Sequence, residues 1–174
     1  GVPFERHKIG LEHVDLSALQ AHCGDQRPAT VLGKHLCGTA SDYALRAVAH
    51  ASRQVDAMVL STCCHHRCEY GVYPNRPFLE SAGFASESDF RVLCRMSSWA
   101  VDGGSGGSAI PSPDADLGIA VDRRAVGRMS KALLDMGRVG YLRAHGYACW
   151  RSEYVDASAT LENVMLVAQP RAAR

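Results

Sequence analysis

Three cysteines and two histidines lie within one hexapeptide, Cys63 to Cys68, which reads CCHHRC. Thiolates and imidazoles are common zinc ligands, and an imidazole also transfers protons near neutral pH. A closed zinc site needs four ligands, usually two pairs from separate segments, whereas this hexapeptide can supply about two. The chain has no C-x-x-C or H-x-x-H pair to complete it. The motif therefore favours a site loop without a metal, in which His65, His66 or Arg67 faces a ligand. Buried cysteines that merely turn a corner are the alternative.

A second motif, GKHLCG, places Lys34 and His35 between the glycines Gly33 and Gly38 at the end of an apolar stretch. Glycines allow a ligand to approach the backbone closely. The motif is too short for a phosphate loop, and no G-x-x-x-x-G-K-[ST] sequence occurs in the chain. An ordinary strand-to-helix turn with a solvated Lys34 is the alternative. Asp15 ends an earlier apolar stretch and could accept hydrogen bonds from an adenosine group, or it could simply cap a helix or turn.

Basic residues gather locally, because Arg124, Arg128 and Lys131 repeat at helical spacing. Such a stripe could contact RNA phosphates, although a solvated helix face is the more frequent explanation. The formal net charge of the chain is only +1. RNA binding would therefore depend on this local clustering and not on bulk charge.

Apolar patterning predicts the elements that position these motifs. We expect a strand ending at His13 and a buried strand at residues 29–32. A helix capped by Ser41-Asp42 follows, and then another buried strand at residues 55–60. The apolar face of that helix would consist of Ala44, Leu45, Val48 and Ala49. This order indicates an α/β fold with parallel strands, whose ligands bind at the carboxyl ends of the strands. Both motifs follow such strand ends.

The second half of the chain predicts further helices and a C-terminal strand pair. We expect a short helix near Phe78, a helix from Glu87 to Trp99, and a flexible surface insert at about residues 103–116, which are rich in glycine, serine and proline. A helix from about Ala120 should bury the stripe Val126, Met129, Leu133 and Met136, and Arg138 to His145 should form a second short helix. Strands at residues 147–155 and 161–168 are joined by only a short turn, so they should pair antiparallel.

The composition bounds the class of protein. The 174 residues fit one domain, with 47% hydrophobic and 21% charged residues. No apolar run is long enough to span a bilayer, so no membrane association is expected, and no protein partner is evident. The seven cysteines are odd in number and unevenly spaced, which argues against an extracellular disulfide framework. We therefore expect an intracellular protein.

The motifs also occur in a recognisable order. FERHKIGLEHVDLSAL, GKHLCG, ASDYALRAV, CCHHRC, RMSSWA, GRVGYLRAHGY and LENVMLVA follow one another along nearly the whole chain. This set resembles the eukaryotic tRNA 2'-O-methyltransferases, which modify the ribose of nucleotide four in the acceptor stem. GKHLCG is shared with looser relatives, whereas CCHHRC together with RMSSW is specific to this family.

The resemblance implies S-adenosylmethionine as methyl donor, tRNA as acceptor and a Rossmann-like class I methyltransferase sheet. The candidate catalytic residues are then Lys34, His35, His65 and His66. The candidate cofactor residues are Asp15, Gly33, Leu36 and Cys64. Asp15 matches the position that often binds the adenosine part of the cofactor, and the loop from Gly33 to Leu36 matches the one that borders the methyl group. Arg67 and Arg95 join Arg124, Arg128 and Lys131 as candidate contacts to RNA phosphates.

One feature of the family is absent from the sequence. The glycine-rich cofactor loop should follow the first strand, yet no G-x-G sequence precedes Phe4. We therefore expect an N-terminally incomplete sheet, in which the strand ending at His13 is the family's third, and weak or absent cofactor binding by this chain alone. The alternative function is a non-catalytic RNA- or zinc-binding fragment.

Overall fold

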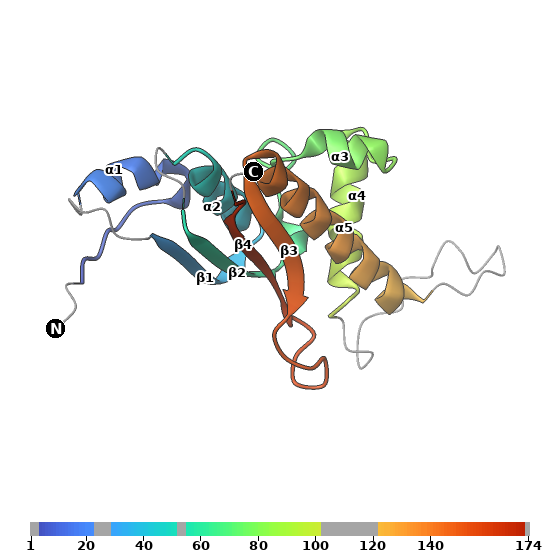
Figure 1. The fold of residues 1–174 in the computed structure, drawn as a ribbon. Coiled ribbons are helices and arrows are strands. Elements are labelled where there is room, and N and C mark those ends of the chain that lie inside the picture. The colour runs from blue at the N-terminus through green and yellow to red at the C-terminus, as the bar shows by residue number, and fades with distance from the viewer. Residues whose placement is uncertain (1–3, 23–28, 52–54, 102–121, 173–174) are drawn as a thin grey trace.

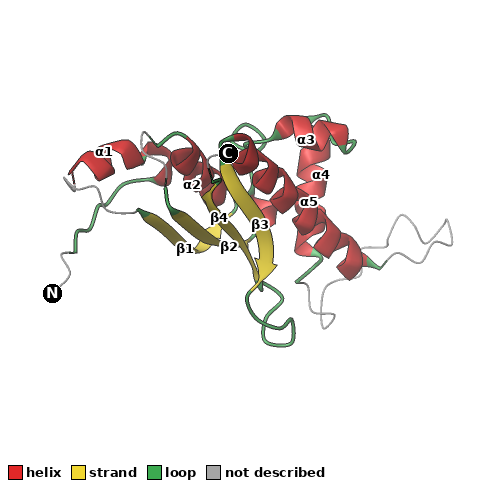
Figure 2. Ribbon diagram, viewed as in Figure 1, coloured by secondary structure: helices red, strands yellow, loops and turns green. Residues whose placement is uncertain are grey.

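The computed structural model describes residues 4–22, 29–51, 55–101 and 122–172. The insert predicted at residues 103–116 lies outside these ranges. The described part is a mixed α/β structure, in which helices pack against a small twisted sheet (Figures 1 and 2). No helix within these ranges is both long and apolar enough to cross a bilayer.

Four strands form the sheet in the order β1-β2-β4-β3. Their bounds are Thr30–Cys37 for β1, Ala57–Cys63 for β2, Tyr147–Glu153 for β3 and Val164–Pro170 for β4. β1 and β2 are parallel, and β4 inserts antiparallel between β2 and β3. The predicted C-terminal antiparallel pair is confirmed, with a continuous register from Tyr147 opposite Pro170 to Glu153 opposite Val164.

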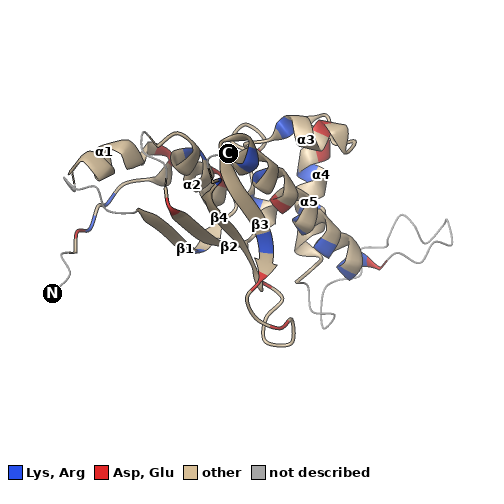
Figure 3. Ribbon diagram, viewed as in Figure 1, with Lys and Arg blue, Asp and Glu red and all other residues tan. Residues whose placement is uncertain are grey.

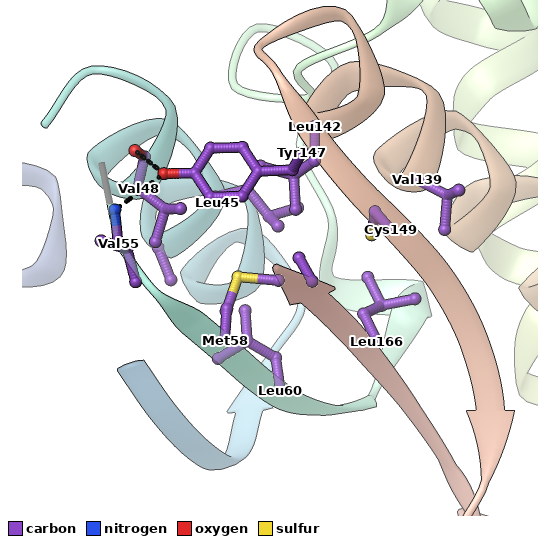
Figure 4. Packing of buried hydrophobic residues seen from close by; sticks show 12 residues of the cluster. Leu45, Val48, Val55, Met58, Leu60, Val139, Leu142, Tyr147, Cys149 and Leu166 are labelled. Atoms are coloured by element: carbon purple, nitrogen blue, oxygen red, sulfur yellow. Dashed lines mark hydrogen bonds between the residues drawn. The ribbon is translucent and has the colours of Figure 1, made fainter. Parts of the chain in front are cut away.

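The main core lies between one face of the sheet and the helices α2, Thr39–Ala49, and α5, Arg123–Ala144. Leu45 and Val48 of α2 pack with alternate residues of β2 and β4, which point to the same face because strand side chains alternate. Figure 4 shows Tyr147 crossing this core, where its hydroxyl accepts a hydrogen bond from the Val55 amide at 3.1 Å and donates one to the Val48 carbonyl at 3.4 Å. The predicted apolar face of α2 is confirmed.

A second, smaller core joins α5 to α3, Arg76–Ser81, and α4, Glu87–Ser98. Tyr73, Phe90, Leu93 and Leu134 are buried there. The side chain of Ser86 accepts the Asp89 amide while the Asp89 carboxylate accepts the Ser86 amide, so a capping box starts α4. Both helices lie where the sequence predicts them.

The predicted first strand is wrong. Residues Leu11–His13 form the 3-10 helix η1 and Leu16–His22 form the helix α1. The Asp15 carboxylate accepts the amides of Ser17 at 2.8 Å and Ala18 at 3.2 Å, which favours a helix start over an extended chain. The alternation of apolar residues before Asp15 is too short to determine a strand.

β1 and α2 differ from their predicted bounds. β1 runs through the polar motif to Cys37, with a register shift between Gly33 and Leu36, because an edge strand tolerates exposed polar residues. α2 begins at Thr39, so Ser41 and Asp42 lie in its first turn and do not cap it. Both are buried.

α5 buries only part of the predicted stripe: Val126 and Leu133 are half-buried, and the fully buried residues of the helix are others. Met129 is 70% exposed and Met136 43% exposed, whereas Asp135 and Arg138 are at most 1% exposed. The prediction failed because buried charges that pair with each other are invisible to apolar periodicity. The helix is also continuous to Ala144, so the separate helix predicted from Arg138 does not form.

Candidate active site at the ends of β1 and β2

The two sequence motifs contact each other at the carboxyl ends of the parallel strands β1 and β2. Cys37 lies opposite Cys63 in the strand register, and their Sγ atoms are 3.1 Å apart. Gly38 has a φ of 57°, and a Cβ atom there would lie 2.5 Å from the Arg67 carbonyl oxygen. The Thr39 hydroxyl donates to that same oxygen at 3.0 Å. Only glycine fits at position 38, so close packing of the two motifs depends on it.

Unusual backbone conformations mark both motifs. His35, with a φ of 59°, and Cys64, with a φ of 41°, are the non-glycine residues with positive φ in the described ranges. Such conformations cost about 1 kcal/mol or more and gather at functional sites. Lys34 and His35 are both exposed at the irregular part of β1. The strain therefore lies where the sequence predicts the site.

The two adjacent histidines have different surroundings. His65 begins the 3-10 helix η2, His65–Arg67, and is 2% exposed. Its Nε2 atom lies 2.8 Å from Asp135 Oδ1, and Thr62 donates to Asp135 Oδ2 at 3.2 Å. A carboxylate can only accept, so Nε2 carries the proton. The buried Nδ1 atom has no hydrogen-bond partner among the described residues. His66 is exposed.

Asp135 belongs to a buried charge network centred on Arg138. Nε of Arg138 donates to Asp42 Oδ1 at 2.8 Å, Nη2 to Asp42 Oδ2 at 3.2 Å, and Nη1 to Asp135 Oδ1 at 3.1 Å. Burial alone raises the pKa of the Asp135 carboxyl, but the His65 imidazole and the Arg138 guanidinium outweigh it and lower that pKa to about 2. At Asp42, burial outweighs the attraction of Arg138 and raises the pKa. The network fastens α5 to α2 and to the motif loop.

The candidate site residues line three different cavities. His66 and Arg95 share one of about 400 Å³. Gly33 and Lys34 line another, of about 570 Å³, on the sheet face opposite the main core. Asp15 lines a third, of about 320 Å³, beside α2. The structure thus brings the two motifs into contact, but His66, Lys34 and Asp15 line three separate cavities.

The candidate RNA-binding residues also differ in exposure. Arg67, Arg95, Arg124 and Arg128 are exposed, the last two on one face of α5. Figure 3 shows positive charge along α5 and α4. Lys131 is buried, and its Nζ atom lies 2.5 Å from Glu162 Oε2. Its charge is therefore already neutralised by the protein.

The two glycines of the GKHLCG motif pack closely against other parts of the protein. A Cβ atom at Gly33 would lie 2.4 Å from the Leu36 side chain and 2.6 Å from that of Leu60. Gly38 packs against Arg67. Gly38 thus makes room for the backbone of Arg67, whereas Gly33 both packs against these leucines and lines the cavity of about 570 Å³.

Sequence reasoning missed four residues of this region: Cys37, Asp42, Asp135 and Arg138. Cys37 has no second cysteine beside it in the sequence, yet it ends a strand parallel to the one that ends at Cys63. Asp135 and Arg138 carry opposite charges at i,i+3 spacing, a pattern that marks a charge pair but not its burial.

Comparison with known proteins supports a single family. The family model described as "Methyltransferase TRM13" matches residues 2–169. The human "tRNA:m(4)X modification enzyme TRM13 homolog" is 26% identical over 96% of this chain and 49% of its own length. The Schizosaccharomyces pombe "tRNA:m(4)X modification enzyme TRM13" is 30% identical, over 95% of this chain and 46% of its own length. This chain therefore spans about half the length of these relatives. No solved structure matches it significantly. The chain belongs to the TRM13 methyltransferase family.

Proposed function

We propose that this chain forms the part of a tRNA 2'-O-methyltransferase that contacts the tRNA. The whole enzyme would use S-adenosylmethionine to methylate a ribose in the acceptor stem. The observation that carries the proposal is the contact between GKHLCG and CCHHRC at the carboxyl ends of β1 and β2. Ligands of open α/β sheets bind at such strand ends. The relatives named as tRNA:m(4)X modification enzymes supply the substrate class.

We further propose that the four strands are one part of a Rossmann-like class I methyltransferase sheet. β1 stands at the edge of the described sheet and is parallel to β2, as expected if further parallel strands continue beyond it. The exposed Leu32 of β1 and the open cavity beside it fit this view, because an apolar edge strand favours pairing. Cofactor binding would then need residues outside this chain.

Transfer of a methyl group to a ribose hydroxyl requires the hydroxyl to lose its proton. His35 and His66 are exposed imidazoles, either of which could accept the proton. Lys34 precedes His35 and lines a different cavity from His66, so we propose that it would stabilise the developing alkoxide where His35 is the base. His65 is buried against Asp135, so we assign it a different role, that of holding η2 against α5. Among the four candidates, His66 lies beside an arginine in a cavity and is the first to test.

The exposed arginines fit contact with an RNA backbone. Arg95 lines the cavity of His66, and Arg124 and Arg128 extend the positive charge along α5. Phosphate contacts of this kind fix the position of the RNA without reading its sequence. Lys131 is already paired with Glu162, so we propose that it holds the segment before β4 in place.

The test is methyl transfer to unmodified tRNA by a protein that contains this chain together with the remaining length of its relatives. Methylation of a 2'-hydroxyl blocks alkaline cleavage of the neighbouring phosphodiester, so the product identifies both the reaction and the nucleotide. We expect His66→Ala to lower kcat by about 10²–10⁴-fold, the usual contribution of general acid–base catalysis. The matched control is His145→Ala, at an exposed histidine after α5. Equal rates for the two variants would remove His66 from the mechanism, and base methylation without alkali resistance would overturn the reaction itself.

Calorimetry on this chain alone separates catalysis from the non-catalytic alternative. We expect tRNA to bind and S-adenosylmethionine to bind weakly or not at all, because the described ranges contain no G-x-G sequence that could form the glycine-rich cofactor loop. Micromolar cofactor affinity would contradict that expectation. If the longer protein also fails to bind the cofactor while tRNA still binds, a bare RNA-binding module is the better description.

A further inference from the structure

Three thiols converge at the point where the two motifs meet. The Sγ atoms of Cys37, Cys63 and Cys64 all lie within 4.8 Å of one another. The two closest, of Cys37 and Cys63, are 3.1 Å apart, well beyond a sulfur–sulfur bond of about 2.05 Å, and all three residues are free cysteines. The cluster is therefore an arrangement of separate donor atoms and not a disulfide.

The backbone brings these thiols together at a cost. Successive strand residues point to opposite faces, so Cys63 and Cys64 should point apart. The left-handed conformation of Cys64, with a φ of 41°, breaks this alternation and brings both sulfurs to Cys37. His35, the other non-glycine residue with positive φ in the described ranges, lies two residues before Cys37. Strain on both sides of one cluster indicates a functional constraint.

The spacing of the sulfurs suits a tetrahedral ion. Zinc–thiolate bonds are about 2.3 Å long, which places the sulfurs of a tetrahedral site about 3.8 Å apart. The Cys37–Cys63 separation of 3.1 Å is shorter than this value, and all three sulfurs lie within 4.8 Å of one another, so small side-chain movements would bring them to it. Three protein ligands with an open fourth position are typical of zinc sites that bind water or a substrate oxygen. Cys37 and Cys64 are half-buried, so an ion could enter from the surface.

We propose that Cys37, Cys63 and Cys64 form a binding site for one zinc ion, held by three thiolates with its fourth position open. Binding exchanges three thiol protons for the divalent ion, so three sulfur–metal bonds form and three protons leave to solvent. The proposal is independent of methyl transfer, because the ion can bind whether or not the chain acts on tRNA.

The state of the thiols sets the pH dependence of this site. Burial, followed by a hydrogen bond with the Cys37 thiol, raises the pKa values of Cys63 and Cys64. Glu162 also faces Cys64, and its carboxylate contributes to that rise, while Lys131 offsets part of its charge. The ion must therefore displace bound protons at neutral pH, and its apparent affinity should increase as the pH rises.

The experiment is a cobalt titration of this chain under reducing conditions, followed by displacement with zinc. Cobalt bound by thiolates absorbs in the near ultraviolet through sulfur-to-metal charge transfer. The parent for all variants is Cys23→Ala, which removes the one cysteine outside the described ranges. We expect about one cobalt ion per chain, with protection of Cys37, Cys63 and Cys64 from alkylation when zinc is bound.

Cys64→Ala is the informative variant, because Cys64 is half-buried and its loss should leave the fold intact. We expect its metal affinity to fall by more than about 100-fold, since loss of a residue that only supports a ligand already costs about 10–100-fold. The matched control, Cys149→Ala in β3, should bind metal as the parent does. The proposal is overturned if the folded parent gives no charge-transfer absorption, or if Cys64→Ala and Cys149→Ala bind cobalt equally.

Discussion

Replacement of Arg138 by methionine tests whether the buried charge network fastens α5 to α2. Arg138 is fully buried and donates three hydrogen bonds to Asp42 and Asp135, neither of them more than 1% exposed. Methionine keeps much of the apolar stem but removes the ion-pair partner of Asp42, while Asp135 keeps only His65 at 2.8 Å and Arg151 at 3.8 Å. Removal of one partner from a buried pair costs about 3–5 kcal/mol of unfolding free energy.

The expected loss is large enough to measure by urea denaturation followed by circular dichroism. With a denaturant slope of about 2 kcal/mol per molar urea, the midpoint should fall by about 2 M. Arg128→Met, an exposed arginine on the same helix, is the matched control and should change the unfolding free energy by less than about 0.5 kcal/mol. Adding Asp42→Asn to Arg138→Met should recover part of the loss, because the unpaired carboxylate charge of Asp42 is then removed.

Two results would refute this reasoning. If Arg138→Met and Arg128→Met had equal urea midpoints, the buried ion pairs of Arg138 would contribute no more to the unfolding free energy than an exposed arginine does. If Asp42→Asn brought no recovery in the Arg138→Met background, the two residues would not be coupled, and the loss would come from packing alone.

Three further predictions concern the same helix and its neighbours. The folded-state pKa of Asp135, about 2, lies below its ordinary value of 3.8, so its stabilisation is complete above pH 3.8 and is lost as the pH falls toward 2. That loss amounts to about 2 kcal/mol, and urea titrations across this pH window should show it in the parent but not in Asp135→Asn. Gly127→Ala should lower the unfolding free energy by about 1–3 kcal/mol in the same assay, because its Cβ would lie 2.2 Å from the Ala100 amide nitrogen. Gly71→Ala, whose Cβ would have no atom within 4 Å, is the control. Equal stability of the two variants would contradict the close approach of α5 to Ala100. Tyr73→Phe should lower the unfolding free energy by about 1 kcal/mol and with it the thermal midpoint, because the buried Tyr73 hydroxyl donates to a backbone carbonyl at 2.8 Å. An unchanged midpoint would show that this hydrogen bond adds nothing to stability.

Elements with a clear local signal were predictable from the sequence. The helix predicted from Glu87 to Trp99 forms as α4, and the short turn between the last two apolar stretches predicts the antiparallel pair. The helical structure that replaces the strand expected to end at His13 was not predictable. A few alternating apolar residues suggest a strand, but the Asp15 carboxylate, which accepts backbone amides, starts a helix instead.

The candidate site was predictable in place but not in detail. Motifs at the carboxyl ends of two neighbouring parallel strands must lie side by side, and they do, although β1 runs through GKHLCG to Cys37. The sequence could not tell which histidine of CCHHRC is buried, because that depends on where Asp135 of α5 comes to lie. Nor could it pair Cys37 with Cys63, since their contact is set by strand register over 26 positions of sequence.

The position of β4 in the sheet has a consequence for how the protein is made. β4 follows every other described strand in the sequence, yet it lies between β2 and β3 and is the only strand that joins them in the described sheet. During synthesis on the ribosome, the β1–β2 pair and β3 must therefore wait for the C-terminal segment before they share hydrogen bonds. Pairings so distant in sequence form slowly, so a chain stalled before residue 164 would present two unmatched strand edges to chaperones.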